Sequence, residues 1–340
     1  MPSPFPHLPK EHRGTVHRLT HHSKALDGNP WNDPVVRDLW VYVPPNSGET
    51  LLPCIFILPA FAGTGENFLA RGLSDTPMSA RLDRLHADGC PPFIAVMPDS
   101  MTSVGGSQYI DSPGVGNYAT YIAQELKETI DNEFNTNGNW GVIGRSSGGF
   151  GALHLTMAHP GLFQAVGCHA GDMGFDLMFL GEIGPAIQGI NELGGVHTFY
   201  ERFWSLHRPG HTHFAGFNLL AMAYAYQTTP IVPELGPTLP VDLDTGEFRY
   251  SVIQDWMQFD PVVKVLDATN QDALRALRCL FIDVGNRDEY QLHLGARRLT
   301  RRLAEKGIDH IYEEFNGGHR GTAYRFNHSL PILSRALRDD

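Results

Sequence analysis

Residues 140–153 read WGVIGRSSGGFGAL, an apolar run that ends in a Gly-x-Ser-x-Gly motif and continues into small and apolar residues suited to a helix. A strand, a sharp turn and a helix in this order are typical of a nucleophile elbow, in which a serine is held on a strained turn. Side chains two positions before and after such a serine would collide. Gly144 and Gly148 therefore select Ser146 rather than Ser147, whose second neighbour on the amino-terminal side is a bulky arginine.

Apolar runs of strand length recur on both sides of this segment. Residues 37–43 alternate like a half-buried strand, residues 54–58 form a continuous apolar run, and similar runs recur at residues 93–97, 140–143, 164–169, 279–283 and 310–315. Two segments between them show the spacing of amphipathic helices, residues 118–134 and 292–306. Strands that alternate with helices predict an α/β fold with a mostly parallel central sheet covered by helices on both faces.

The alternation stops at residues 171–277, which carry many aromatic residues, glycines and prolines but no strong strand run. A structureless loop of this length is uncommon in a compact domain, so we expect a long, mainly helical insertion that forms a lid. Within it, residues 214–226 are suited to a helix, whereas residues 231–240, with three prolines, are not. The predicted organisation is a first core part, an insertion and a second core part: residues 1–170 (with an N-terminal extension, 1–35), 171–277 and 278–340.

A serine hydroxyl is a weak nucleophile, so a histidine and a carboxylate must assist it, in the order serine, acid, histidine for this kind of elbow. Asp288 follows the run at residues 279–283, and His319 ends an Asn-Gly-Gly-His loop after the next run. One helix and one strand fit between them, which returns both side chains to the edge of the sheet where Ser146 lies. Asp283 competes for the role of acid, but we expect it to pair locally at its strand end, and Glu289 is next in line.

Two turns are expected to supply backbone N–H groups for an oxyanion. The N–H of Ser147 lies at the start of the helix after the elbow, where a helix favours negative charge. The second donor comes from the small, Gly-rich loop after the third strand, residues 58–65. Pro59 has no N–H, so Phe61 is the first choice and Ala62 the reserve.

These motifs together resemble the putative-esterase branch of the α/β-hydrolases, which includes esterase D (S-formylglutathione hydrolase), enterochelin esterase-like proteins, feruloyl esterases and mycolyltransferases. The matching pieces span residues 36–170 and 279–328 and are the elbow, Gln108-Tyr109, Gly116-Asn117-Tyr118, Gln124-Glu125-Leu126, Gly285 to Asp288 and Gly317-Gly318-His319. The resemblance implies a triad of Ser146, Asp288 and His319 and hydrolysis of carboxylic esters without a cofactor. One departure is Pro59-Ala60, where many members carry His-Gly or Ser-Gly.

The insertion leaves the predicted sheet beside the elbow, so its apolar surface is expected to roof Ser146 and to favour small-molecule esters with apolar or aromatic bulk. Phe203, Trp204 and Arg145 are the expected substrate contacts. An acyltransferase that uses the same triad with an alcohol acceptor is the alternative, as the mycolyltransferase resemblance allows. A binding module that kept the fold but lost catalysis is a third option, which a complete triad disfavours.

Charge and hydropathy exclude some classes of partner. Lys and Arg total 26 against 37 for Asp and Glu, a formal net charge of −11, which disfavours binding to nucleic acid or to an anionic membrane. The apolar runs are too short to span a bilayer, and residues 1–10 are Pro-rich without an apolar signal-peptide core. We therefore expect a cytoplasmic protein, and association into a homo-oligomer is compatible with the sequence.

Metal and disulfide sites are not expected. The cysteines show no CxxC spacing and are predicted to be reduced core thiols: Cys54, Cys90, Cys168 and Cys279. A histidine cluster, His207, His211 and His213, has no carboxylate or cysteine within it and no regular periodicity, so we interpret it as a solvated or substrate-facing loop. His154, on the helix after the elbow, is interpreted as a packing residue.

Overall fold

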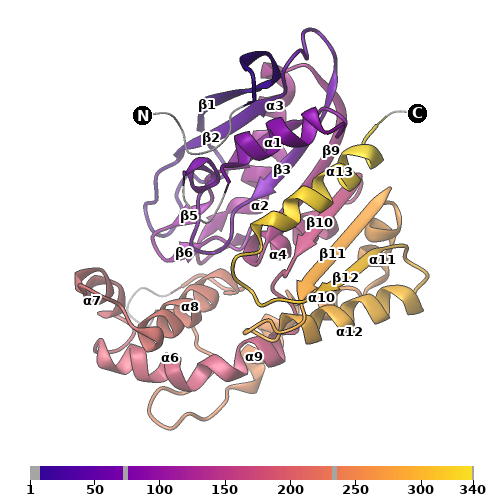
Figure 1. Ribbon diagram of the computed structural model, residues 1–340. Helices are drawn as coiled ribbons and strands as arrows, with labels where there is room; N and C mark the ends of the chain where they lie inside the picture. The colour runs from indigo at the N-terminus through magenta and orange to yellow at the C-terminus, as the bar shows by residue number, and fades with distance from the viewer. Residues whose placement is uncertain (1–7, 72–75, 232–235, 339–340) are drawn as a thin grey trace.

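The computed structural model describes residues 8–71, 76–231 and 236–338, and its centre is an eight-stranded sheet. The sheet order is β1-β2-β4-β3-β9-β10-β11-β12 (Figure 1). Its strands are β1 (Thr15–His22), β2 (Val36–Val43), β3 (Leu52–Leu58), β4 (Ile94–Pro98), β9 (Thr136–Arg145), β10 (Ala165–His169), β11 (Cys279–Gly285) and β12 (Ile311–Phe315). The strands from β4 to β12 pair in parallel, and β1 and β2 are antiparallel additions at one edge. The mostly parallel sheet expected from the sequence is confirmed.

Helices cover both faces of this sheet because side chains alternate along each buried strand. On β3, Ile55 and Ile57 pack on one face, against α1 (Met78–Ala87) and α13 (Phe326–Ala336). Cys54, Phe56 and Leu58 point to the other face. The helices on that second face are α3 (Lys127–Glu133), α4 (Ser147–Ala158) and α12 (Leu292–Glu305).

Of the two predicted helices, the first differs in detail from expectation and the second forms as expected. The segment 118–134 begins as α2 (Tyr118–Thr120), continues as a π-helical turn (Tyr121–Leu126) and ends in α3. The segment 292–306 is α12. Short elements complete the core: 3-10 turns at Lys10–His12, Gly65–Leu69 and Ala323–Arg325, and the ribbon strands β5 (Met101–Thr102), β6 (Gly105–Gly106), β7 (Asp111–Ser112) and β8 (Gly116–Asn117).

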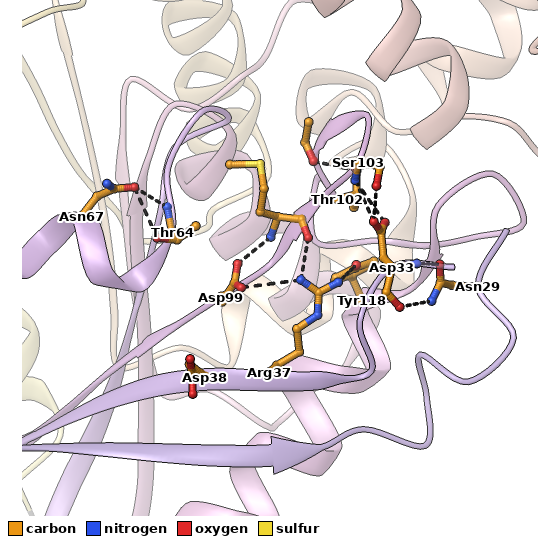
Figure 2. Close-up of polar contacts among 12 residues, drawn as sticks. Asn29, Asp33, Arg37, Asp38, Thr64, Asn67, Asp99, Thr102, Ser103 and Tyr118 are labelled. Carbon is orange, nitrogen blue, oxygen red and sulfur yellow. Dashed lines mark hydrogen bonds and ion pairs between the residues drawn. The ribbon is translucent and has the colours of Figure 1, made fainter. Parts of the chain in front are cut away.

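The N-terminal extension is fixed to the core by buried polar side chains (Figure 2). Asp33 accepts a hydrogen bond from the backbone N–H of Ser103 at 2.9 Å. Arg37, at the start of β2, donates to the Met101 carbonyl at 2.7 Å and to the Tyr118 hydroxyl at 2.7 Å. These bonds satisfy groups that would otherwise be buried without partners, and they hold the loop after β4 in place.

The segment between β10 and β11 is helical over most of its described length. Its helices are α5 (Phe175–Met178), α6 (Leu180–Glu192), α7 (Phe199–Ser205), α8 (His211–Ala225), α9 (Tyr250–Met257), α10 (Pro261–Lys264) and α11 (Ala268–Arg275). The pair α6 and α8 packs together at one side of the sheet, with α7 beside it (Figure 1). In contrast, α10 and α11 pack against α4 and extend the core. No helix occurs in the described part of residues 231–240, whereas 232–235 lie outside the described residues.

Two further expectations can be compared with the structure. All four cysteines are buried and none forms a disulfide, as predicted. In the described part of the chain, no helix is long and apolar enough to cross a membrane.

Candidate active site

Ser146 lies on the sharp turn between β9 and α4. Its backbone has φ +56° and ψ −126°, a conformation that L residues rarely adopt and that is typical of strained functional turns. Its N–H donates to the His169 carbonyl at 2.9 Å, which ties the turn to β10. A Cβ on Gly144 would lie 2.3 Å from the Gly148 backbone, and a Cβ on Gly148 would lie 2.3 Å from the Leu58 carbonyl oxygen. The close approach therefore requires both glycines of the motif.

The structure brings His319 between Ser146 and Asp288. The His319 Nε2 atom lies 3.1 Å from Ser146 Oγ, and the Nδ1 atom lies 2.8 Å from Asp288 Oδ2. Asp288 is buried, and its other oxygen accepts the backbone N–H of Tyr290 at 2.9 Å. A carboxylate at Nδ1 favours the tautomer with its proton on that atom, which leaves the Nε2 lone pair facing the serine hydroxyl.

The loops after β11 and β12 are bonded to each other, which places these two side chains. The Asn286 N–H donates to the Phe315 carbonyl and the Arg287 N–H donates to the Gly317 carbonyl, each at 2.9 Å. Glu289, the next candidate acid, accepts the backbone N–H of His319 at 2.6 Å. That bond is the main reason why the pKa of Glu289 is lowered. Glu289 thus holds the backbone of the histidine and not its ring.

Asp283 belongs to a separate buried network. Its Oδ1 lies 2.6 Å from Nδ1 of His169, and its Oδ2 accepts from Arg325 Nε at 2.6 Å. The Nε2 of His169 lies 2.8 Å from the hydroxyl of Ser329, so this network repeats the serine, histidine and carboxylate pattern. Because Ser329 is 0% exposed, no substrate reaches it. The network anchors α13 to β10 and β11, which agrees with the expectation that Asp283 pairs locally.

The candidate oxyanion donors lie in the turn of the elbow and in the loop after β3. Ser147 is the first residue of α4, and Phe61 lies in the loop after β3, with its ring 6.1 Å from the ring of Phe217 on α8. The Tyr109 hydroxyl donates to the Pro59 carbonyl at 2.5 Å and so fixes the start of that loop. The N–H groups of Phe61 and of the reserve, Ala62, remain predictions as oxyanion donors.

A carboxyl group that the sequence analysis missed lies beside the nucleophile. Asp172 follows β10, is 2% exposed, and lies 3.3 Å from Ser146 Oγ through Oδ1. Its Oδ2 accepts from the Ser147 hydroxyl at 3.0 Å and from Gln108 Nε2 at 3.2 Å. Burial raises the pKa of Asp172. The sequence held one signal for Asp172: it comes just after a predicted strand, at the edge of the sheet where Ser146 lies. Its contact with Gln108 joins segments far apart in sequence, so no local pattern indicates it.

The three expected substrate contacts occupy different environments. Arg145 is half-buried and lines a pocket of about 430 Å³ together with the loop residues Ala60 and Ala62. Phe203, on α7, is 4% exposed and packs with its ring 4.8 Å from that of Phe217. Trp204 is 69% exposed. Aromatic rings thus connect α7 through Phe217 to the loop after β3, and contact of these residues with substrate stays a prediction.

The histidine cluster differs from the expected loop. His211 and His213 lie in the first turn of α8, and only His207 precedes the helix. Carboxylates come from α6, with Glu182 3.7 Å from His211 and Glu192 3.1 Å from His213. The expectation of a loop was wrong for His211 and His213 because α8 is buried along most of its length and so shows no amphipathic spacing. The exposed side chain of His211 agrees with the expectation of a solvated segment. Within the described ranges, no group of three or more His, Cys, Asp or Glu side chains is arranged to hold a metal ion.

Comparison with known proteins shows the family of the chain. The family model described as putative esterase matches residues 36–336, and the chain belongs to that family. The fold and the family together define an esterase of the α/β-hydrolase class, a carboxylic-ester hydrolase.

Solved structures share the fold at low sequence identity. A ferulic acid esterase is 19% identical with a TM-score of 0.60, covering 96% of this chain and 99% of its own. An S-formylglutathione hydrolase from Agrobacterium tumefaciens is 16% identical with a TM-score of 0.59, covering 97% and 98%. A fluorophosphonate-binding serine hydrolase from Staphylococcus aureus is 14% identical with a TM-score of 0.57, covering 96% and 100%. At these identities the likeness concerns the fold.

Proposed function

We propose that this esterase cleaves its substrates through an acyl-enzyme on Ser146, with His319 as base and acid and Asp288 as the residue that orients the histidine. The observation that carries the proposal is the unbroken line of contacts from Asp288 to His319 Nδ1 at 2.8 Å and from His319 Nε2 to Ser146 Oγ at 3.1 Å. Both distances allow hydrogen bonding in the resting protein.

The first half of the reaction forms the Ser146 ester. His319 Nε2 takes the hydroxyl proton as Ser146 Oγ bonds to the carbonyl carbon, and the carbonyl oxygen becomes an oxyanion. The N–H groups of Ser147 and Phe61 stabilise that charge in our proposal, each contributing about 10²-fold or more to kcat. His319 then gives its proton to the alcohol oxygen as the bond from carbon to that oxygen breaks.

The second half regenerates the serine. Water loses a proton to His319 Nε2 and attacks the acyl carbon, and the proton returns to Ser146 Oγ as the carboxylic acid leaves. Asp288 remains ionised throughout and stabilises the imidazolium in both halves.

The substrate preference is proposed from the aromatic surface of α7 and α8. The rings of Phe203 and Trp204 lie 4.8 Å and 5.9 Å from that of Phe217, whose ring is 6.1 Å from that of Phe61 in the loop after β3. Each methylene that a substrate buries there adds about 0.8 kcal/mol to binding. Esters with apolar or aromatic bulk are therefore expected to react faster than acetyl esters, with Arg145 and its pocket receiving part of the substrate.

A panel of p-nitrophenyl esters of increasing acyl length, with a thioester and a feruloyl ester, tests this function. We expect release of the leaving group with every ester and a kcat/KM that rises from acetyl to butyryl. Product analysis with and without an added alcohol separates hydrolysis from acyl transfer. A transferred ester as the main product would replace the hydrolase proposal with the acyltransferase, and the absence of any turnover would refute both.

A further inference from the structure

We infer that Asp172 recognises the acyl group, and that the preferred substrates are esters whose acyl chain carries a hydrogen-bond donor, a hydroxyl or an ammonium, on the carbon next to the carbonyl. This inference rests on the proposed function, because it concerns the group that Ser146 carries.

The order of the strands fixes the side of Ser146 on which Asp172 lies. Ser146 follows β9, and β9 lies between β3 and β10 in the sheet. The oxyanion loop follows β3, whereas Asp172 follows β10, so the two flank the nucleophile on opposite sides. In the tetrahedral intermediate the oxyanion faces the β3 side and the leaving oxygen faces His319. The remaining substituent, the acyl chain, is left to face Asp172.

Distance brings the acyl group within reach of Asp172. Asp172 Oδ1 is 3.3 Å from Ser146 Oγ. The acyl carbon bonds to that oxygen at about 1.4 Å and the next carbon follows at about 1.5 Å, so both are near the carboxyl. Asp172 and Gln108 form a polar cluster that also contacts the insertion. The Nε2 atom of Gln108 lies 2.8 Å from Met222 Sδ and 3.4 Å from the Tyr226 hydroxyl.

Acylation removes a hydrogen bond that Asp172 needs. Among the described residues, Oδ2 has two donors, Ser147 and Gln108, whereas the group that faces Oδ1 is the hydroxyl of Ser146, which has one proton to share between Oδ1 and His319 Nε2. That hydroxyl proton is transferred to His319 during attack, and the ester oxygen that results has no proton to donate. A buried carboxyl oxygen without a partner is costly, so an acyl group that supplies a donor at this point is favoured in the transition state.

A second acceptor in the same cluster also has no partner. The Oε1 atom of Gln108 is buried and accepts no hydrogen bond within the described part of the chain. Gln108 is held there with a left-handed backbone, φ +55°, and is 0% exposed. Gln108 Oε1 thus has no donor, and Asp172 Oδ1 loses its donor when Ser146 is acylated, so the cluster of Asp172 and Gln108 holds two oxygen atoms that a donor on the substrate can pair. A substrate that brings a hydroxyl or an ammonium complements it, whereas a plain hydrocarbon chain does not.

Three ethyl esters of the same size test the inference: those of phenylacetic acid, mandelic acid and phenylglycine, which carry hydrogen, hydroxyl and ammonium on the carbon next to the carbonyl. We expect kcat/KM for at least one donor-bearing ester, in one of its enantiomers, to exceed that for phenylacetate about tenfold or more. Whether the mandelate or the phenylglycine ester has the higher kcat/KM tells whether the preferred donor is a hydroxyl or an ammonium. A ratio of about one or less in both arms of the wild-type protein would overturn the inference.

Variants of Asp172 assign the effect to this residue. The ratio of kcat/KM values within one variant cancels any general loss of activity, so it is the quantity to compare. Asp172→Leu removes both acceptor oxygens and should bring the ratio to about one, whereas Asp172→Asn keeps one acceptor and should lose the ammonium preference first. Asp176→Asn, at an exposed ion pair with Arg298, is the control and should leave the ratio unchanged. A preference that persists in Asp172→Leu would refute the assignment.

The same samples separate this inference from the proposed function. If the wild-type protein hydrolyses phenylacetate as fast as the other two esters, the esterase mechanism stands and the role of Asp172 fails. If none of the three esters is cleaved and a fluorophosphonate does not label Ser146, the proposed function itself fails.

Discussion

Asp283 and Asp288 each lie against the Nδ1 atom of a histidine, but the two histidines are different. Asp283 pairs with His169 at 2.6 Å inside the core, whereas Asp288 pairs with His319 at 2.8 Å beside Ser146. The first carboxyl lies within β11, in the network with His169 and Arg325, and the second lies in the loop that follows the strand. Two aspartates five positions apart in sequence therefore have different roles: Asp283 stabilises the fold, and Asp288 faces the histidine beside the nucleophile.

Replacing each aspartate with asparagine should have opposite effects. Asp288→Asn is expected to lower kcat by up to roughly 10⁴-fold with little change in melting temperature, because an amide can favour the wrong tautomer of His319. Asp283→Asn breaks a buried pair with Arg325 and should destabilise the protein by about 3 kcal/mol, with a milder effect on kcat. Steady-state kinetics and calorimetry on both variants measure this. An inactive but stable Asp283→Asn protein would reassign the acid.

The glycines of the elbow should not tolerate a methyl group. Gly148→Ala places a Cβ 2.3 Å from a backbone oxygen of Leu58, and neither backbone segment can move without displacing Ser146. We expect a loss of stability of about 2 kcal/mol or more and a large fall in kcat. Gly184→Ala is the matched control, because its Cβ meets nothing within 4 Å in α6, and it should be neutral or stabilising. Equal melting temperatures for the two variants would contradict the account.

His154 should weaken the fold in acid. Burial against Phe150 and near Phe259 lowers the pKa of His154 to about 3, whereas in the unfolded chain it is about 6.5. Between these values the unfolded chain binds a proton that the folded chain does not, so stability falls as the pH falls through this window. His154→Phe should reduce that loss, measured as melting temperature against pH. The exposed His207→Phe should not, and identical acid slopes for all three proteins would exclude this role.

Trp204 tests the role of the aromatic surface with less effect on stability than Phe203 does. Because it is 69% exposed, Trp204→Ala should leave stability nearly unchanged while it reduces the gain in kcat/KM from acetyl to butyryl or aryl-acyl esters. Phe203→Ala should reduce the same gain, but it also leaves a cavity among buried rings and is expected to cost roughly 3 kcal/mol of stability. If both variants keep the wild-type ratio between esters, the helices α7 and α8 serve packing or assembly and not substrate selection.

The buried strands and the elbow were predictable because their signals are local. Apolar runs placed β3, β4, β9, β10 and β11, and an alternating run placed β2. The strand β12 was placed by the mixed run HIYEEF and is exposed or half-buried along its length. The edge strand β1 was not predicted, because its sequence, TVHRLTHH, is mostly polar and its half-exposed residues need no apolar alternation. It forms through pairing with β2 along its whole length, a contact between distant segments that no local pattern shows.

In the site, too, local sequence signals predicted some residues and not others. The positions of Asp288 and His319 could be predicted because each follows a recognisable strand at the carboxyl edge of the sheet. Asp172 also follows such a strand, but it stands in a Gly-rich segment with no second polar residue to mark it. Its partner Gln108 comes from a loop with a left-handed backbone at both Gln108 and Tyr109, a conformation that their residue types do not suggest.

Mass spectrometry of the protein after reaction with a fluorophosphonate tests the central claim most directly. We expect one adduct per chain on the peptide that contains Ser146, no adduct in Ser146→Ala, and labelling retained in Ser147→Ala, which keeps its backbone N–H. In the same pair, kcat for esters should fall by about 10⁴-fold or more for Ser146→Ala and far less for Ser147→Ala. An adduct on Ser147, or labelling and turnover that persist in Ser146→Ala, would contradict the assignment of the nucleophile.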